Sequence, residues 1–402
     1  MRPLDEARAE VLGAVTRQPA ETVPVFNARN RVLAAPVVAA QPVPSFANSA
    51  MDGFAVRASD VAEVPCELEI VEDVPAGLVP TLPVVEGQAT RIMTGAPVPE
   101  GADSIVIVEE TRSNESVVTV LASPTTGDHI RPAGSDVEAG ATILGEGIRL
   151  TPRHLASAAS VTGKLEVSVR PTVAFMSTGD EVVAPDTETL EPGKIRDTNR
   201  VLLRSMLEEL SIPHIDLGII DDDLDSLRSA YERAAGQADV IVSTGGVSMG
   251  DHDYVKQILG ELGTVDFWRV AMQPAKPFAF GHVAGTPLFG LPGNPVSTFV
   301  AFEQFLRPAL LHMMGATRTL RPRITGTIGE DVSTSPEKEV YLRVILARDG
   351  RNLVALKSGG QGSNVLSALA AAEAFAVVPV GVGSLSAGDD VTLEMFRWME
   401  DR

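Results

Sequence analysis

The chain has 402 residues, 44% of them hydrophobic, and its formal net charge is −20. A chain of this length exceeds what one hydrophobic core supports, so we expect two to four domains. The negative charge argues against nucleic acid or an anionic membrane surface as a partner, because both favour basic patches. An anionic substrate would have to be received by local Lys or Arg side chains, backbone amides or a metal ion.

The cysteine count and the hydropathy exclude further classes. The single cysteine, Cys66, excludes an internal disulfide and a cysteine-based zinc site. No apolar run reaches the ~18 residues of a membrane helix, so no membrane insertion is expected. The first residues, which include Asp5, Glu6 and Glu10, are unlike a signal peptide, and a cytoplasmic location is predicted.

The first 57 residues combine helical periodicity with extended, proline-rich chain. Apolar residues at helical spacing predict an amphipathic helix over residues 4–17, and a second short helix is expected over 28–34, ended by Pro36. A turn at 49–53 then leads into a strand over 54–56. Asp52 in this turn fits a turn-forming role, which is usual for Asp before Gly, and it also fits a functional role.

Residues 66–121 alternate between short apolar runs and proline-rich connections, which predicts a small β-rich insertion. Thr94 begins a long polar loop between two of these strands, and Asp136 lies on a glycine-flanked turn within 130–140. Each segment taken alone is an ordinary loop. A helix follows over 152–161, with Thr151 as its expected cap.

From Pro171 to about Gly315 strands and helices alternate, which predicts a doubly wound, three-layer α/β domain. Strands are expected at 173–177, 214–220, 240–242 and near 290, together with a pair of strands inside 265–281. Helices are expected over 199–210, with Asn199 as a possible cap, over 224–235 and 254–259, and after Asn294. Arg269, Gln273 and Lys276 project from the strand pair as candidate counter-ions for a bound oxyanion.

Three turns of this region share one design, in which an apolar strand is followed by glycine and polar residues. The first contains Ser177, Thr178, Gly179 and Glu181, the second contains Gly245, Gly246, Asp251 and Asp253, and the third contains Gly293 and Asn294. Because loops collect at the carboxyl ends of parallel strands, the three turns are expected to line one cleft for a polyanion. Carboxylates beside an anion fit a bridging divalent cation, whereas a tight turn with a solvated acidic helix start is the simpler alternative.

After Leu320 the chain reads as short strands with turn signals between them, which predicts a small β-barrel or sandwich. A glycine-rich loop at 358–364 precedes a helix expected over 365–372. This loop either caps that helix, which we favour, or binds an anion.

Five motifs follow one another along nearly the whole chain: SAMDGFAV, RIMTGAPVPEGAD, STGDEV, IVSTGGVSMGDHDYV and GLPGNPVS. Together they resemble the molybdopterin molybdenumtransferase (MoeA) family and the E domain of gephyrin. The resemblance implies a multidomain α/β plus β fold, with a central MogA/MoaB-like three-layer α/β/α domain, a β-rich insertion and a C-terminal small β-barrel. It also implies an elongated, L-shaped homodimer of four subdomains, formed by residues 1–45 with 138–170, by 46–137, by 171–317 and by 318–402.

The reaction of this family inserts molybdate into adenylylated molybdopterin and releases AMP, so the resemblance implies a transferase that uses Mg²⁺. The catalytic residues that it implies are Asp52, Thr94, Asp136, Glu181, Asp222, Asp253, Arg269 and Lys276. Glu181 and Asp253 would position Mg²⁺, while Arg269 and Lys276 would stabilise charge on molybdate or phosphate. The substrate-binding residues that it implies are Ser177, Thr178, Gly179, Gly245, Gly246, Ser248, Pro292, Gly293, Asn294 and Ser363.

One segment departs from the family. Where the family usually reads KPGKP, this chain has Gln273-Pro274-Ala275-Lys276-Pro277, which removes one cation and narrows the backbone freedom of the turn. The resemblance therefore also implies an alternative, a gephyrin-like scaffold that binds a membrane receptor tail or a tubulin-like division protein between the α/β and barrel subdomains. A third class, a nucleotide-binding hydrolase on the α/β domain, leaves the β insertion unexplained.

Overall fold

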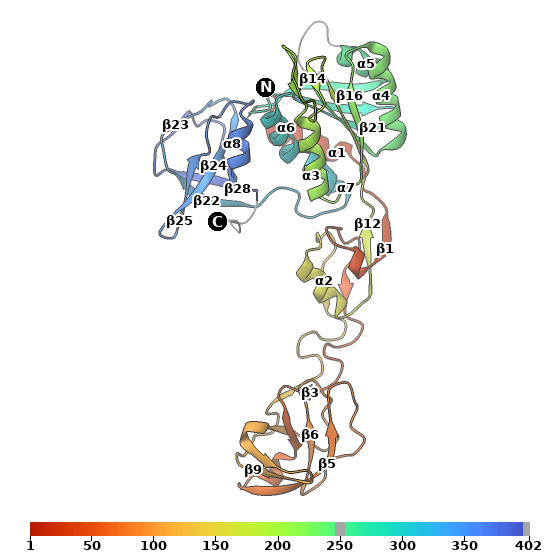
Figure 1. The fold of residues 1–402 in the computed structure, drawn as a ribbon, viewed down its shortest axis with the longest axis vertical. Coiled ribbons are helices and arrows are strands. Elements are labelled where there is room, and N and C mark those ends of the chain that lie inside the picture. The colour runs from red at the N-terminus through yellow and green to blue at the C-terminus, as the bar shows by residue number, and fades with distance from the viewer. Residues whose placement is uncertain (246–253, 397–402) are drawn as a thin grey trace.

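The computed structural model describes residues 1–245 and 254–396, which form four units in an elongated molecule (Figure 1). An α/β unit lies at one end with a β-barrel beside it. A small middle unit connects the α/β unit to a distal β unit at the other end of the long axis. Among the described residues, no helix is long and apolar enough to cross a membrane.

The α/β unit is built on one six-stranded sheet with the strand order β16-β13-β17-β21-β20-β18. Its strands are β13 (Val173–Thr178), β16 (His214–Ile220), β17 (Val240–Thr244), β18 (Gly263–Arg269), β20 (Pro277–Val283) and β21 (Thr286–Leu291). The first three and β21 are parallel, as predicted, whereas β20 runs antiparallel to both of its neighbours. The sheet is mixed because short connections join β18 to β20 and β20 to β21, and a parallel pairing would need a much longer crossover.

Helices cover both faces of this sheet, which gives the predicted three layers. They are α1 (Leu4–Ala14), α3 (Asn199–Glu209), α4 (Leu224–Gln237), α5 (Tyr254–Leu262), α6 (Pro295–Ala301) and α7 (Arg307–Met313), with the π-helical turn η4 (Phe302–Leu306) between the last two. One core packs α1, α3 and α6 to α7 on the first face, and a second packs α4 and α5 on the other. Thr198, not Asn199, occupies the N-cap position of α3.

The predicted N-terminal helix is confirmed as α1, but its packing differs from the predicted grouping of residues 1–45. Its buried residues Leu4, Ala7 and Val11 join the core of the α/β unit and not that of the middle unit. The periodicity of an amphipathic helix reveals its apolar face but not the surface that will cover it. The exact subdomain boundaries stay a prediction.

The middle unit combines β1 (Ala20–Pro24), β2 (Val37–Val38), β11 (Thr142–Leu144), α2 (Pro152–Ala159) and β12 (Lys164–Ser168). The predicted helix over 28–34 is wrong: the segment follows a short 3₁₀ turn, η1 (Val25–Asn27), and then extends. Asn30 has φ 62°, which ends any right-handed helix, and Val32 and Leu33 pair with Arg149 and Val167 as bridges. Thr151 is the N-cap of α2, as predicted.

The distal β unit confirms that the β insertion has its own sheet, ordered β7-β4-β6-β5-β9-β8. Its elements are β3 (Asn48–Ser49), β4 (Gly53–Val56), η2 (Ala58–Val61), β5 (Cys66–Val74), β6 (Gln88–Ile92), β7 (Ser104–Ile107), η3 (Val108–Glu110), β8 (Thr111–Ser113), β9 (Val117–Val120) and β10 (Ile130–Arg131). Two chain segments connect it to the middle unit, where Val43 and Val137 form a bridge.

The C-terminal unit is a closed five-stranded β-barrel, because β24 pairs with β26 as well as with β25. Its elements are β22 (Arg323–Ile328), β23 (Val332–Ser333), β24 (Glu339–Asp349), β25 (Asn352–Lys357), α8 (Leu366–Ala371), β26 (Ala374–Val378), β27 (Ser384–Leu385) and β28 (Asp390–Met395). The short strand β19 (Met272–Gln273) leaves the α/β unit and pairs with β24. The barrel is therefore attached to the α/β unit directly beside the carboxyl edge of its sheet.

Candidate functional site

The carboxyl ends of β13, β17 and β21 lie side by side, as the three strand–turn–helix patterns predicted. They open into a cavity of about 710 Å³, which we call the large cavity. Predicted site residues that line it are Ser177, Thr178, Glu181, Gly245, Pro292, Gly293 and Asn294. The two-strand ladder of β14 (Val182–Val183) and β15 (Ile195–Arg196) forms part of its wall.

Buried hydroxyls join two of these strand ends. Ser177 is 2% exposed, and its Oγ donates to Asp197 Oδ1 over 3.1 Å and lies 3.0 Å from Thr244 Oγ1. The Thr178 Oγ1 lies 3.5 Å from the carbonyl oxygen of Thr244. These contacts link the carboxyl ends of β13 and β17 in the wall of the large cavity.

Two glycines lie where the backbone comes close to other atoms of the site. Gly245 has φ 88°, and a Cβ there would lie 2.6 Å from the Thr178 carbonyl oxygen. Gly179 has φ 135°, and a Cβ there would lie 2.6 Å from Glu181 Oε2. Both positions favour glycine, because a side chain there would be strained and would crowd these neighbouring atoms.

Carboxylates gather at the rim formed by the ends of β13 and β16. Burial raises the pKa of Asp222, and the charges of Asp180 and Glu181 raise it further. Oxygen donors of this kind suit Mg²⁺. The described residues contain no complete three-ligand group, and the second predicted magnesium ligand, Asp253, lies outside them together with Gly246 and Ser248.

A second cavity of about 310 Å³, the small cavity, lies between the α/β unit and the barrel. Two lysines line it, the predicted Lys276 and also Lys338 from the turn before β24, together with Gln273, Ser297 and the predicted Ser363. Pro277, Pro292 and Asn294 line both cavities, so the two are neighbours. The sequence offered only a positive charge in a barrel turn as a signal for Lys338.

The loop at 358–364 closes the small cavity from the barrel side. The buried Arg343 donates through its NH2 group to the carbonyl oxygens of Gly360 and Gly362, and Gln361 Oε1 accepts from the Arg343 backbone N–H. The favoured role of this loop as a helix cap is wrong, since the N-cap of α8 is Val365 and no side chain caps it. The loop instead presents Ser363 and Gln361 to the small cavity.

The segment that departs from KPGKP, residues 273–277, lines the small cavity. Gln273 is exposed to the small cavity, and Ala275 is buried with φ 70°. The turn thus keeps a left-handed backbone without glycine, which costs on the order of 1–3 kcal/mol. Arg269 ends β18 at the outer edge of the sheet and is not part of either cavity wall in the described chain.

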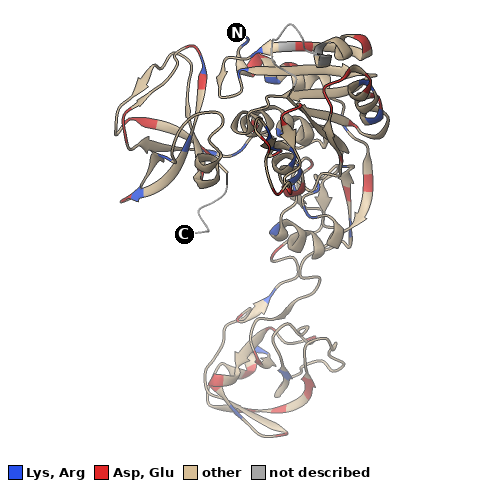
Figure 2. Ribbon diagram, turned by 45° about the horizontal axis from the view of Figure 1, so that its top comes forward, with Lys and Arg blue, Asp and Glu red and all other residues tan. Residues whose placement is uncertain are grey.

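The remaining predicted residues belong to the distal β unit. Asp52 Oδ1 accepts from the backbone N–H and the Oγ1 hydroxyl of Thr94 over 2.7 and 2.8 Å, and these bonds lower the pKa of Asp52. Asp136 is exposed on the segment that leads back to the middle unit. Figure 2 shows the distal unit well separated from the α/β unit, so one chain does not bring this trio to the large cavity.

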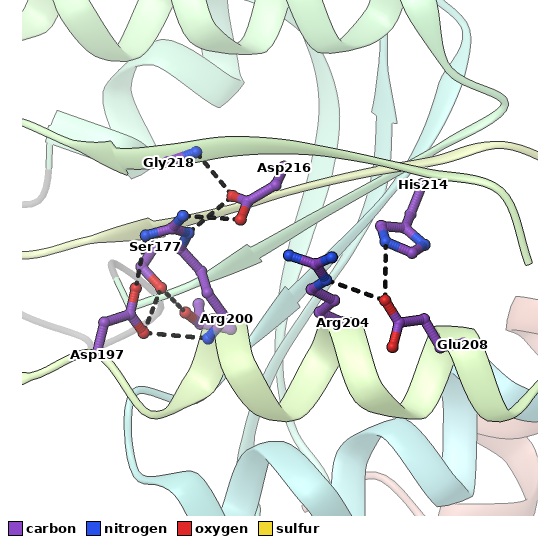
Figure 3. Close-up of polar contacts among 9 residues, drawn as sticks. Ser177, Asp197, Arg200, Arg204, Glu208, His214, Asp216 and Gly218 are labelled. Atoms are coloured by element: carbon purple, nitrogen blue, oxygen red, sulfur yellow. Dashed lines mark hydrogen bonds and ion pairs between the residues drawn. The ribbon is translucent and has the colours of Figure 1, made fainter. Parts of the chain in front are cut away.

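Asp197 and Asn199 are site residues that the sequence did not assign, although Asn199 was considered as a cap. They line the large cavity and are 3% and 8% exposed. Figure 3 shows that Arg200 joins Asp197 to Asp216 on β16, with two bonds of 2.8 and 2.7 Å to the Asp216 carboxylate. In the sequence, the only signal for these two site residues was a short polar run before a predicted helix.

Comparison with known proteins first establishes the class. Residues 174–312 match the model described as "Probable molybdopterin binding domain", a range that holds nearly all of the six-stranded sheet and most of the residues that line the large cavity. Residues 2–162 match "MoeA N-terminal region (domain I and II)", and residues 325–396 match "MoeA C-terminal region (domain IV)". The class is therefore defined by an α/β domain of this type, flanked by the N-terminal and C-terminal regions that the MoeA models describe.

Full-length relatives specify the family. The chain is 38% identical to "Molybdopterin molybdenumtransferase 2" of Mycobacterium tuberculosis over 91% of this chain and 93% of that protein. It is 35% identical to "Molybdopterin molybdenumtransferase" of Haemophilus influenzae over 99% of each. The "molybdopterin biosynthesis moeA protein" of Pyrococcus horikoshii superimposes with a TM-score of 0.83 at 27% identity, covering 98% of this chain and 100% of that one. The chain belongs to the MoeA family, and the predicted fold and transferase class are confirmed.

Proposed function

We propose that the protein inserts molybdate into adenylylated molybdopterin in an Mg²⁺-dependent reaction that releases AMP. The observation that carries this proposal is the pair of neighbouring cavities with different chemistry. The large cavity offers glycine turns and hydroxyls, which suit the phosphate groups of a molybdopterin nucleotide. The small cavity offers Lys276 and Lys338, which suit a compact oxyanion such as molybdate.

The shared wall gives the two substrates a place to meet. Pro277, Pro292 and Asn294 border both cavities. The Asn294 side chain makes no capping bond to α6, although this residue occupies the N-cap position. Its amide therefore remains available to a ligand at the junction. Holding two anions next to each other is costly in water, and fixed donors on both sides lower that cost.

The acidic rim is the proposed place for Mg²⁺. Glu181 and Asp253 are the proposed ligands, and Asp222 lies near Glu181, since burial and then the negative charges of Asp180 and Glu181 raise the pKa of Asp222. A bound Mg²⁺ would neutralise charge on the phosphate oxygens of the nucleotide. Lys276 and Lys338 would hold molybdate by its oxygens.

We also propose that the protein acts in the cytoplasm as a homodimer, in which the distal β unit of one subunit reaches the large cavity of the other. This supplies Asp52, Thr94 and Asp136, which are remote from the cavity of their own chain. Apolar side chains that are exposed in the single chain support a partner, and Phe26 at 92% exposure is the most extreme of them.

Complementation tests the activity. The parent gene is expected to restore nitrate reductase activity in a transferase-deficient strain, and Lys276→Ala is expected to reduce it strongly. Lys357→Ala is the matched control, because Lys357 pairs with Glu330 on the barrel and lines neither cavity. If the parent fails to complement while its soluble dimer binds a membrane receptor tail, the scaffold function replaces the enzymatic one.

Mixing variants tests the shared site. Asp52→Asn and Lys276→Ala homodimers should each be inactive, because each lacks one component of both sites. After subunit exchange, half of the dimers carry one intact site, so about a quarter of the parental activity should return. No recovery despite proven exchange would place Asp52 and Lys276 in the same chain's site or outside it.

A further inference from the structure

The beginning of α3 presents two buried acceptor atoms in the wall of the large cavity. Asp197 Oδ1 accepts from Ser177 Oγ and from the Arg200 backbone N–H, and Asn199 Nδ2 donates to the Gly293 carbonyl oxygen over 2.8 Å. The second oxygen of Asp197, Oδ2, and the amide oxygen of Asn199, Oδ1, are buried and receive no hydrogen bond from the described residues. A buried acceptor without a donor is unfavourable, so a ligand that donates would relieve both.

Arg200 forms an ion pair with the Asp197 carboxylate but does not supply the hydrogen bond that its Oδ2 atom lacks. Its NH1 atom lies 3.5 Å from Asp197 Oδ2, which is an ion pair but too long for a good hydrogen bond. Its Nε and NH2 atoms are directed to Asp216 (Figure 3). The carboxylate is thus held in place while one of its oxygens stays available.

These acceptors specify the chemistry of the ligand. A carboxylate and an amide oxygen attract N–H donors and repel phosphate oxygens, so the phosphate groups of a ligand belong away from Asp197 and Asn199. Apolar side chains also line the cavity, among them Val182, Ile195 and Leu366, and these suit the faces of a flat ring. The combination fits the N–H edge of a planar heterocycle.

We propose that Asp197 and Asn199 select the pterin ring of the substrate by accepting hydrogen bonds from its 2-amino and ring N–H groups. The inference rests on the proposed function, since it places the pterin end of that substrate in the large cavity. Arg200 and Asp216 are positioning residues, which hold the carboxylate but do not touch the ring. A ring with an oxygen in place of the 2-amino group would bind poorly, because that oxygen and the protein oxygen that faces it are both hydrogen-bond acceptors.

Two fluorescent probes test this directly with the full chain in equilibrium dialysis. They are 6-hydroxymethylpterin and 6-hydroxymethyl-lumazine, which differ by the 2-amino group against a 2-oxo group. The parent is expected to prefer the pterin at least tenfold. Asp197→Asn and Asn199→Leu are expected to reduce the preference below threefold. Asp216→Asn, which loosens Arg200 from outside the cavity, should give an intermediate ratio.

Glu208→Gln is the matched control. Glu208 lies on the same helix, pairs with Arg204 over 3.0 Å and is outside the large cavity (Figure 3). Its preference for the pterin should equal that of the parent. Thermal melting of each variant separates lost selectivity from lost folding, and if Asp197→Asn does not fold, Asn199→Leu and Asp216→Asn decide the question.

The remaining outcomes are distinguishable. Equal binding of the two probes by a parent that releases AMP overturns the inference and leaves the proposed function standing. A parent that neither binds the pterin nor releases AMP overturns the proposed function. An Asp197→Asn variant that keeps the pterin preference but loses Mg²⁺ binding in calorimetry would identify Asp197 as a metal ligand, which also overturns the inference.

Discussion

The barrel and the distal β unit are both β structures attached to the rest of the chain, but they are attached in opposite ways. At the barrel, Phe375 packs with Phe299 of α6, Tyr341 and Phe396, with ring centroids 5.7, 5.4 and 4.6 Å apart. The described apolar clusters of the distal and middle units do not merge across their junction. There only two extended segments connect the units.

Polar contacts increase this difference. Gln304 on η4 donates to Glu394 on β28 over 2.6 Å and accepts from Arg8 on α1 over 2.9 Å, so three elements meet in one buried network. Gln304 lies in the π-helical turn η4, where it is fully buried. The barrel is therefore joined to the α/β unit by apolar and polar packing, whereas the position of Asp52 and Thr94 depends on two extended segments.

The largest expected effect is at the barrel junction. Phe375→Ala should lower the free energy of unfolding by about 3–5 kcal/mol, because Phe375 is fully buried and truncation leaves a cavity. Chemical denaturation measures this. Val43→Ala at the distal tether is the contrasting variant, with an expected loss below about 1 kcal/mol, and Val380→Ala on the exposed barrel surface serves as control. Equal losses for Phe375 and Val43 would remove the contrast.

A smaller effect is expected from the polar network. Gln304→Ala should cost about 1–3 kcal/mol, because Glu394 and Arg8 each lose a partner in a buried place. The same denaturation experiment applies, with Arg204→Ala on the exposed face of α3 as control. A loss no larger than that of the control would show that the barrel is held by its apolar contacts alone.

Substitution of Asp222 is expected to change the stability of the fold still less, and in a way that depends on pH. Because the folded chain raises the pKa of Asp222 above 3.8, its contribution to stability is present below pH 3.8 and is lost as the pH rises through the raised value. Asp222→Asn should therefore be slightly more stable than the parent at pH 7, by no more than about 0.5 kcal/mol because this partly buried carboxylate is still screened by solvent, and equal to it near pH 3. Thermal melts at both pH values measure it, and added Mg²⁺ should remove the difference. A variant less stable than the parent at pH 7 without Mg²⁺ would contradict this.

The smallest effect is expected in the distal β unit. Thr94→Val removes the hydroxyl that donates to Asp52, so the pKa of Asp52 should rise toward its ordinary value while the backbone bond from residue 94 remains. Carboxyl NMR titration measures this change. The melting temperature should hardly change, since both groups are exposed. An unchanged pKa would mean that the backbone bond alone sets it.

Much of the fold followed from sequence patterns because those patterns are local. The apolar runs at 173–178 and 240–244 and the turns after them determined strands, their parallel pairing and the edge at which Gly245 and Gly293 meet. The prediction of a helix over 28–34 was wrong because Asn30 adopts a left-handed backbone conformation, which composition alone does not reveal.

The sequence by itself determined the family, the layered α/β unit, the β insertion and the barrel, since hydrophobic period and turn residues are properties of short segments. Tertiary structure decided the rest. It brought Lys338 and Lys276 to the same cavity, turned the loop at 358–364 into a cavity wall and brought Asp197 beside Ser177. Such contacts join residues that are distant in the chain, and they depend on how whole units pack, which no local pattern records.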